Sequence, residues 1–457
     1  MQYGGVHQHD VGHGDERCDA RYNFGAPSGS KLSKLEVLFR FAYQDLFTIA
    51  DVATQDSGTV IARCREIASI SEISGATLRT CLSPAMKRCY EVVGNWMTLA
   101  GMTHSVDAAG NLRGLRPGRV PGKRAFLMGS HLDTVSDAGA FDGILGVILA
   151  IAIVENVGSR SLPFDLEIIG FCEEEGVRFP PFVGSRALVG LLDELALAQA
   201  DKAGISLAQA LRDFGLDPAA IPSLALSNRP FGFLEFHIEQ GPVLDAAAEA
   251  IGIVDSIVGQ IRASFEFSGS ANHAGTTPMH LRHDALTAAA QWISAVESVA
   301  LAIPDLVATT GMIHAEPNIS NVVQGRVSVS LDLRHADGEV RRQTFERVWQ
   351  AATDIARQRA IKVSWTNPVM METVQMDAAL TCKLAASAPA GTRHMVSGAG
   401  HDAMILAPHI PSAMLFLRSP GGVSHHPDED VLPQDVGLAL SVGQRFIEAL
   451  IAEYKSS

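Results

Sequence analysis

Histidines and carboxylates recur in four short motifs, and these residue types are suitable ligands for divalent metals. The motifs are His131-Leu132-Asp133 with Asp142 soon after, Glu173-Glu174-Glu175, residues 236–241 (FHIEQG) and residues 421–429 (GGVSHHPDE). Imidazole and carboxylate groups suit zinc or manganese, and Asp133 stands where it can orient the ring of His131. One His-x-Asp alone fits a hydrogen-bonded surface turn at least as well. The four motifs together predict a metal site.

The acidic triplet Glu173–Glu175 favours the same interpretation. Three adjacent carboxylates repel one another, so a buried setting requires a cation or a raised pKa. The ordinary alternative is an acidic turn in solvent. An apolar segment precedes the triplet and residues 179–183 (FPPFV) follow it, which favours burial.

The segments around these motifs predict an α/β fold with a mainly parallel sheet. A strand at Ala125–Gly129, a helix at Gly143–Asn156 and a strand at Phe164–Phe171 form a βαβ pattern. Further strands are expected at 232–238 and 412–417, the latter after a helix at 402–406. Each motif follows one of these strands, and ligand sites of open α/β sheets gather at the carboxyl ends of the strands.

A segment with a different pattern lies between these parts. It predicts strands and helices in the order β-α-β-β-α-β, at 257–268, 285–299, 306–313, 327–333, 340–360 and 361–365. This order is the split βαβ unit of ferredoxin-like domains. We expect an inserted domain at 256–367, a metal-binding domain at 31–255 plus 368–457, and a flexible N-terminal extension at 1–30 whose histidines could bind metal weakly.

Composition narrows the class of protein. The 457 residues are 47% hydrophobic with a net charge of −14, which excludes a disordered chain and disfavours nucleic acid or an anionic membrane surface as a partner. No apolar run reaches the roughly 20 residues that cross a bilayer. The six cysteines form no CxxC pair, so neither a disulfide framework nor a thiolate zinc site is expected. A cytoplasmic protein fits these observations.

Seven motifs resemble, in order, the allantoate amidohydrolase and N-carbamoyl-L-amino-acid hydrolase branch of the zinc peptidase clan that also holds aminoacylases. They are SHLDTV (130–135), FDG (141–143), EEEG (173–176), HIEQGP (237–242), ANHAGTTP (271–278), GAGHDA (398–403) and SHHPDE (424–429). The resemblance runs from about residue 60 to 450. It implies a dinuclear-metal catalytic domain with an inserted lid and dimerisation domain.

The resemblance implies two divalent ions per subunit, bridged by Asp142. His131 and His237 complete the ligands of one ion, and Glu175 and His425 those of the other. Zinc, manganese, cobalt and nickel all tolerate such ligands. Glu174 matches the general base, which takes a proton from water and returns it to the departing nitrogen. Glu173 departs from the Asp or Asn that is more usual before the base.

Four further residues match substrate-binding positions of the branch. His273 resembles a histidine that a partner subunit supplies to the oxyanion, which implies a homodimer. Asn321 and Arg334 resemble the pair that holds the substrate carboxylate, although Arg334 could instead form a surface salt bridge. Gln240 is expected at the amide or ureido group. His401 is not assigned as a ligand and either supports one or caps a helix.

The resemblance implies hydrolysis of a ureido (carbamoyl) C–N bond in a small carboxylate. The sequences of residues 78–85 (LRTCLSPA) and of the metal motifs look most similar to those of allantoate amidohydrolases. These enzymes convert allantoate to ureidoglycine, CO2 and NH3. An N-carbamoyl-L-amino-acid hydrolase or a β-ureidopropionase is the alternative. A remote alternative is a catalytically silent metal-binding scaffold on the same fold. It is disfavoured because neither Glu174 nor a ligand is lost.

Overall fold

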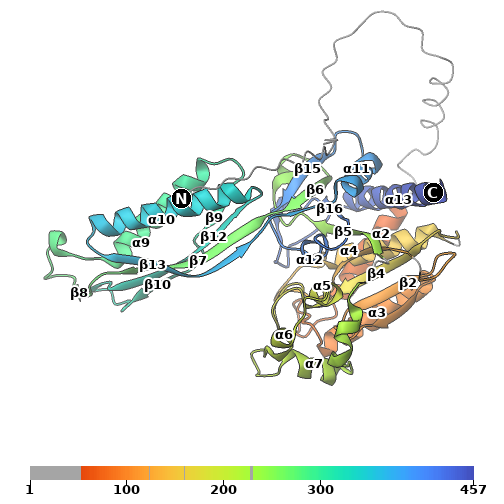
Figure 1. Ribbon diagram of the computed structural model, residues 1–457, viewed down its shortest axis with the longest axis horizontal. Helices are drawn as coiled ribbons and strands as arrows, with labels where there is room; N and C mark the ends of the chain where they lie inside the picture. Colours follow the sequence, from red (N-terminus) through yellow and green to blue (C-terminus); the bar gives the residue numbers. More distant parts are fainter. Residues whose placement is uncertain (1–52, 123, 159, 227–229, 457) are drawn as a thin grey trace, which may run out of the picture. The chain divides into compact units, whose positions relative to one another are not determined.

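The computed structural model describes residues 53–122, 124–158, 160–226 and 230–456. The expected N-terminal extension lies outside these residues. The described part contains a nine-stranded sheet, a five-stranded sheet and a two-stranded ribbon (Figure 1). No described helix is long and apolar enough to cross a membrane.

The nine-stranded sheet has a parallel centre. Its order is β1-β2-β4-β3-β5-β16-β6-β14, with β15 also paired to β6. The four central strands β4 (Asp165–Phe171), β3 (Ala125–His131), β5 (Pro230–Ile238) and β16 (Ser412–Leu417) run parallel to their neighbours in this group. Every residue of β3, β4 and β16 is buried, as expected for strands covered on both faces. The expected parallel sheet is confirmed.

The outer strands make the sheet mixed, because β1–β2, β2–β4 and β6–β16 pair antiparallel. These strands are β1 (Thr103–Val106), β2 (Leu112–Arg116), β6 (Ile251–Ile257), β14 (Val374–Gln375) and β15 (Arg393–Ser397). The helices of this part are α2 (Ala53–Ala68), α3 (Pro84–Leu99), α4 (Ile144–Val157), α5 (Val183–Leu188), α6 (Glu194–Ala198), α7 (Leu207–Phe214), η1 (Pro218–Leu224), α8 (Val243–Ala246), α11 (Ala378–Ser387), α12 (Asp402–Leu406), η3 (Pro420–Gly422) and α13 (Pro433–Ser456).

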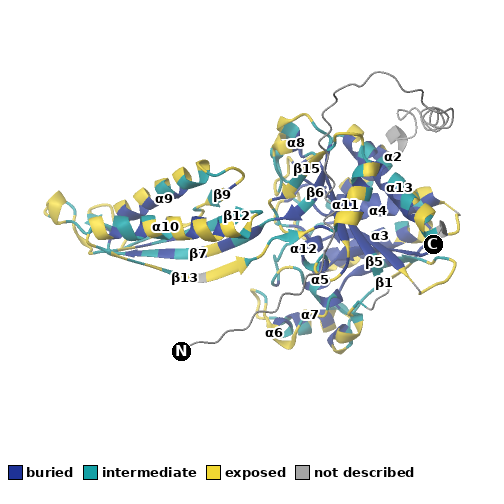
Figure 2. Ribbon diagram, turned by 45° about the horizontal axis from the view of Figure 1, so that its top comes forward, coloured by how far each residue is buried: buried dark blue, intermediate teal, exposed yellow. Residues whose placement is uncertain are grey.

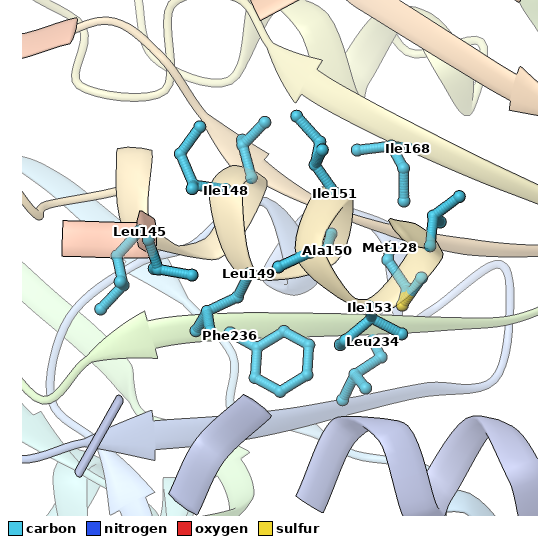
Figure 3. Packing of buried hydrophobic residues seen from close by; sticks show 14 of the residues in the cluster. Met128, Leu145, Ile148, Leu149, Ala150, Ile151, Ile153, Ile168, Leu234 and Phe236 are labelled. Carbon is cyan, nitrogen blue, oxygen red and sulfur yellow. The ribbon is translucent and has the colours of Figure 1, made fainter. Parts of the chain in front are cut away.

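Helix α4 is the centre of the hydrophobic core. It is apolar on all sides, which is the pattern of a buried helix, and 12 of its 14 residues are buried. Figure 3 shows its side chains beside Phe236 and Leu234 of β5. Gly146 permits this close packing, because a Cβ atom there would lie 2.2 Å from the carbonyl oxygen of Phe236. The approach fixes the start of α4, which begins two residues after Asp142.

The five-stranded sheet is antiparallel and lies between β6 and β14 in the sequence. Its strands are β7 (Gly259–Ser268), β9 (Val307–Thr309), β10 (Ile313–Glu316), β12 (Arg326–His335) and β13 (Lys362–Met371), and its helices are α9 (Ala285–Leu301) and α10 (Gly338–Gln358). The ribbon β8 (Asn272–His273) and β11 (Val322–Val323) and the turn η2 (Met279–Leu281) complete it. Buried and less buried residues alternate along β7 and β12, so one face of the sheet packs against α9 and α10. Figure 2 colours the residues of these elements by burial. The expected ferredoxin-like element order is confirmed.

One expected strand of this sheet is interrupted. The segment 306–313 forms two short strands, β9 and β10, which both pair with β12. Three residues between them face two residues of β12, and the hydroxyl of Ser330 accepts the N–H of Met312 at 2.9 Å. This extra residue is a bulge, which periodicity alone does not reveal.

The cysteine interpretation was wrong at one pair. Cys81 and Cys172 form a disulfide across 91 residues of sequence, whereas Cys64 and Cys89 are buried thiols outside any disulfide. Neither cysteine of the pair lies in a spacing motif. The disulfide forms because the fold brings the segment before α3 against the end of β4. Cysteine spacing therefore no longer supports a reducing compartment, and the cytoplasmic location stays a prediction.

Gly146→Ala should destabilise the protein by about 1–3 kcal/mol, the range for overpacked cores. The added Cβ would meet Phe236 and also Ser130, whose Cβ is 2.8 Å away. Thermal denaturation measures the effect. The control is Gly58→Ala in α2, where nothing lies within 4 Å of the new Cβ. Equal melting temperatures for the two variants would contradict the close packing of α4 on β5.

Candidate metal centre

The four motifs meet at the carboxyl ends of the four parallel strands. His131 ends β3, His237 lies one residue before the end of β5, and the triplet Glu173–Glu175 begins two residues after β4. His425 lies in the loop that follows β16. Asp142 precedes Gly143, the first residue before α4, and therefore lies beside the same edge.

The first candidate group consists of His131, Asp142 and His237, all buried. The Nε2 atoms of the two histidines are 3.4 Å apart, and Asp142 Oδ1 lies 3.4 Å from His237 Nε2 and 3.9 Å from His131 Nε2. Each ring has its Nδ1 3.0 Å from a backbone carbonyl oxygen, of Asp133 for His131 and of Ile238 for His237. Nδ1 donates in that contact, so Nε2 is left as the acceptor that a cation requires.

The second candidate group consists of Asp142, Glu175 and His425. His425 Nε2 lies 3.1 Å from Asp142 Oδ2 and 3.7 Å from Glu175 Oε1. Asp142 therefore directs one oxygen to each group. The structure thus brings together all five predicted ligands, in the two sets that the resemblance implied.

The charges of the site favour cations. Burial would raise the pKa of Asp142, but its bond with His425 and the neighbouring His237 and His131 hold it below the usual range. Burial opposes a charge on His131, yet Glu174, Asp133, Glu175 and Asp142 raise its pKa well above the ordinary value.

Glu174 and Glu175 have pKa values shifted upward. Burial, followed by the charge of Asp142, raises the pKa of Glu175 to about 7. Burial also raises the pKa of Glu174 well above its usual range, with Asp402 and Glu175 adding to the rise. Two divalent cations would relieve this repulsion, and the oxygen and imidazole donors suit zinc or manganese. The residues therefore fit a dinuclear centre.

Asp133 holds the acidic triplet in place. Its Oδ1 and Oδ2 accept the N–H groups of Glu174 and Glu175 at 3.2 and 3.1 Å. Glu174 Oε2 lies 3.9 Å from His131 Nε2, at the edge of the first group. Glu173 is directed away from the site, because its Oε1 accepts the N–H groups of Arg178 and Phe179 at 2.7 and 2.8 Å.

Gln240 lies directly against the carboxylate of Asp142. Its Nε2 is 3.1 and 3.0 Å from the two oxygens of Asp142 and 3.3 Å from His425 Nε2. The Oε1 atom of Gln240 is buried without a protein partner. This free acceptor is consistent with the expected contact to a substrate amide.

The remaining predicted residues belong to the inserted segment. His273 and Asn321 lie at one end of it, where Ala274 donates its N–H to the Asn321 carbonyl oxygen at 2.9 Å. The exposed His273 accepts the N–H groups of Gly275 and Thr276 at Nδ1. Among the contacts of the described residues, none joins His273 or Asn321 to the metal groups.

Arg334 forms the salt bridge that was its alternative interpretation. Its Nε and Nη2 pair with both oxygens of Asp332 at 2.8 and 2.9 Å, and its Nη1 donates to the Gly398 carbonyl oxygen at 2.6 Å. The salt bridge occupies the Nε–Nη2 edge of the guanidinium. A substrate carboxylate would therefore have to bind at the Nη1 side.

Two further buried side chains lie beside the predicted ligands: His401, for which the sequence left two interpretations, and Glu235, which it did not single out. His401 packs its ring on His237 with centroids 4.4 Å apart and makes no side-chain cap of α12, so support of a ligand is the better interpretation. Glu235, two residues before His237 in β5, accepts the Ser130 hydroxyl and the Ala403 N–H, both at 2.9 Å. An acidic residue inside an apolar strand was the signal for Glu235.

Residues 127–449 match the profile of peptidase family M20/M25/M40. The chain belongs to this family. An N-carbamoyl-L-amino acid amidohydrolase of Geobacillus stearothermophilus is 38% identical over 81% of this chain and 92% of its own length. An allantoate deiminase of Arabidopsis thaliana is 35% identical over 85% of this chain and 81% of its own.

Solved structures agree with this assignment to the M20 family. An amidase of the hydantoinase/carbamoylase family from Burkholderia multivorans matches with a TM-score of 0.81 and 30% identity, over 86% of this chain and 98% of that one. Within the M20 family the chain belongs to the branch of allantoate amidohydrolases and N-carbamoyl-L-amino-acid amidohydrolases. The resemblance seen in the motifs is confirmed.

Metal loading of this M20 protein should release protons near pH 7, because cations bind deprotonated imidazoles and carboxylates. The pKa of His131 is well above its ordinary value and that of His425 is raised to about 9, chiefly by its bond with Asp142, so both are protonated without metal. Metal affinity should accordingly fall as the pH falls. A pH indicator in dilute buffer measures the release during a Zn²⁺ titration.

The variants His425→Gln and His426→Gln test whether the imidazole of His425 is one source of the released protons. Loss of His425 should remove about one of the released protons. The neighbouring His426 has a side chain that is 57% exposed and belongs to neither candidate group, so its loss should change nothing. Equal proton release in both variants would contradict the assignment of His425.

Proposed function

We propose that this protein hydrolyses a ureido C–N bond of a small carboxylate, and that allantoate is the substrate, with ureidoglycine, CO2 and NH3 as products. The observation that carries the proposal is the pair of ligand groups that share Asp142, in a chain of the carbamoyl amidohydrolase branch. Glu174 is retained beside the first group, which disfavours a silent scaffold.

The mechanism assigns separate roles to the residues of the site. Bound divalent cations would polarise the scissile carbonyl and lower the pKa of an attacking water. Glu174 would accept the proton of that water at a carboxylate oxygen and deliver it to the departing nitrogen. Gln240 would hold the ureido group through its free Oε1. The buried setting of Asp133 keeps the backbone of Glu174 in one position.

The substrate carboxylate and the oxyanion would be bound by the inserted segment. Arg334 can present its Nη1 side to a carboxylate once the Gly398 carbonyl is displaced, while Asp332 continues to orient the guanidinium. Asn321 would bind the same carboxylate. His273 is exposed, and no contact among the described residues joins it to the metal groups of its own chain, which supports a role in the site of a partner subunit. We infer a homodimer for this reason.

Steady-state assays of manganese-loaded and zinc-loaded protein test the substrate. Allantoate should have the highest kcat/KM in a panel with N-carbamoyl-L-amino acids and N-carbamoyl-β-alanine. The alternatives are an N-carbamoyl-L-amino-acid hydrolase, favoured by the similarity to the Geobacillus relative, and a β-ureidopropionase. A higher kcat/KM for a carbamoyl amino acid would replace allantoate as the substrate. No turnover of any ureido compound by metal-replete protein would refute the enzymatic function.

Mixing two inactive variants tests the shared site. Glu174→Gln should keep both metals and lose activity, because the amide cannot accept the proton, and His273→Ala should lose oxyanion stabilisation. Random exchange of subunits at equal amounts makes about half of the dimers mixed, each with one complete site, so about a quarter of wild-type activity should return. The unmixed variants serve as controls. Failure to restore activity, with subunit exchange verified by mass, would contradict the shared site.

A further inference from the structure

Glu429 is a buried carboxylate to which the mechanism assigns no step. It is 4% exposed and lies in the loop between η3 and α13. Its Oε1 accepts the backbone N–H groups of Phe141 and Asp142, both at 3.0 Å, and its Oε2 accepts the hydroxyl of Ser424 at 3.1 Å. All three bonds are donated to the carboxylate, so both of its oxygens act as acceptors.

These bonds join the two loops that carry ligands of the second group. Phe141 and Asp142 belong to the loop before α4, whereas Ser424 and Glu429 flank His425 in the other loop. The N–H of Glu429 also donates to the His426 carbonyl oxygen at 3.0 Å, which closes a turn immediately after His425. One side chain therefore connects the backbone of Asp142 to the segment of His425, although 283 positions separate these ligands.

Close packing holds Glu429 where these bonds require it. Gly139 lies against its side chain, and a Cβ atom at Gly139 would be 2.4 Å from Glu429 Cβ and 2.5 Å from its Oε1. The absence of a side chain at Gly139 leaves the space that the carboxylate occupies. Two consecutive N–H groups on one charged oxygen leave the Asp142 backbone little freedom to rotate.

We propose that Glu429 is a positioning residue of the metal centre, which fixes the backbone of Asp142 relative to His425. Through these bonds the two oxygens of Asp142 face different ligand groups. Glu429 itself belongs to neither candidate group and touches no reacting atom. The inference rests on the metal-binding part of the proposed function and is independent of the substrate.

Cobalt titration of the full-length, metal-free protein tests the proposal. The readouts are the number of bound Co²⁺ ions, their affinity, and the visible absorption bands that report ligand geometry. Glu429→Ala should weaken Co²⁺ binding by about 10- to 100-fold, the usual cost of losing a group that orients a ligand, and should alter the bands. Glu429→Gln keeps an oxygen that can accept both N–H groups, so it should restore the wild-type bands and most of the affinity.

Two further variants separate positioning from a general loss of charge or stability. Asp428→Asn removes a neighbouring carboxylate whose side chain is 83% exposed, and it should bind Co²⁺ as the wild type does. Gly139→Ala leaves Glu429 chemically intact but displaces its carboxylate, so it should weaken Co²⁺ binding in the same direction as Glu429→Ala. The matched substitution Gly58→Ala should have no effect.

The outcomes distinguish this inference from the proposed function. If the wild type binds two Co²⁺ ions and both Glu429→Ala and Gly139→Ala keep its affinity and bands, the positioning role is wrong and the metal centre stands. If the wild type binds no Co²⁺, both the proposed metal centre and the positioning role of Glu429 are wrong. Circular dichroism verifies folding, and Gly139→Ala carries the test if Glu429→Ala does not fold.

Discussion

The carboxylate of Asp142 is the group on which the rest of the site depends. It is buried, and each of its oxygens faces a different set of imidazole and carboxylate groups. A buried charge is costly unless it is paired and hydrogen-bonded, and the Asp142 carboxylate is surrounded by three imidazoles and the Gln240 amide. Removing the partners of Asp142 would therefore affect both ligand groups together.

The position of Asp142 depends in turn on the packing of the sheet. Parallel strands place their carboxyl ends at one edge, so residues as far apart as His131 and His425 can approach. Helix α4 must lie close to β5 for Asp142 to reach this edge, and Gly146 removes the side chain that would prevent it. The apolar core and the polar site are thus parts of one arrangement.

The inserted segment has a different relation to the site. Its five-stranded sheet has its own hydrophobic core around α9 and α10. Arg334 is the residue through which it reaches the GAGHDA loop, by a bond to Gly398. This separation is consistent with a segment that contributes to substrate binding without contributing metal ligands. It also explains why His273 and Asn321 can serve a partner subunit, as we propose, rather than the metal groups of their own chain.

Much of the candidate centre was predictable from the sequence because imidazole and carboxylate side chains are chemically distinctive and most of them lay at or soon after the end of an apolar strand. His131, His237 and the triplet Glu173–Glu175 combined a residue type with a strand end, and the fold placed them together. The strands themselves were predictable because continuous apolar segments such as 412–417 match buried parallel strands. The interruption between β9 and β10 was not predictable from the sequence, since a bulge adds one residue without changing the hydrophobic pattern.

The sequence by itself determined the residue types at the site, the α/β class and the family motifs, because these are properties of short segments. The motifs already paired Glu175 with His425, but only the tertiary structure decided that Glu173 turns to the backbone of Arg178 and that Glu429 binds the backbone of Asp142. It also decided that Cys81 and Cys172 are joined and that Arg334 is paired with Asp332. These are contacts whose geometry depends on how strands and loops pack, and residue spacing carries no information about that packing.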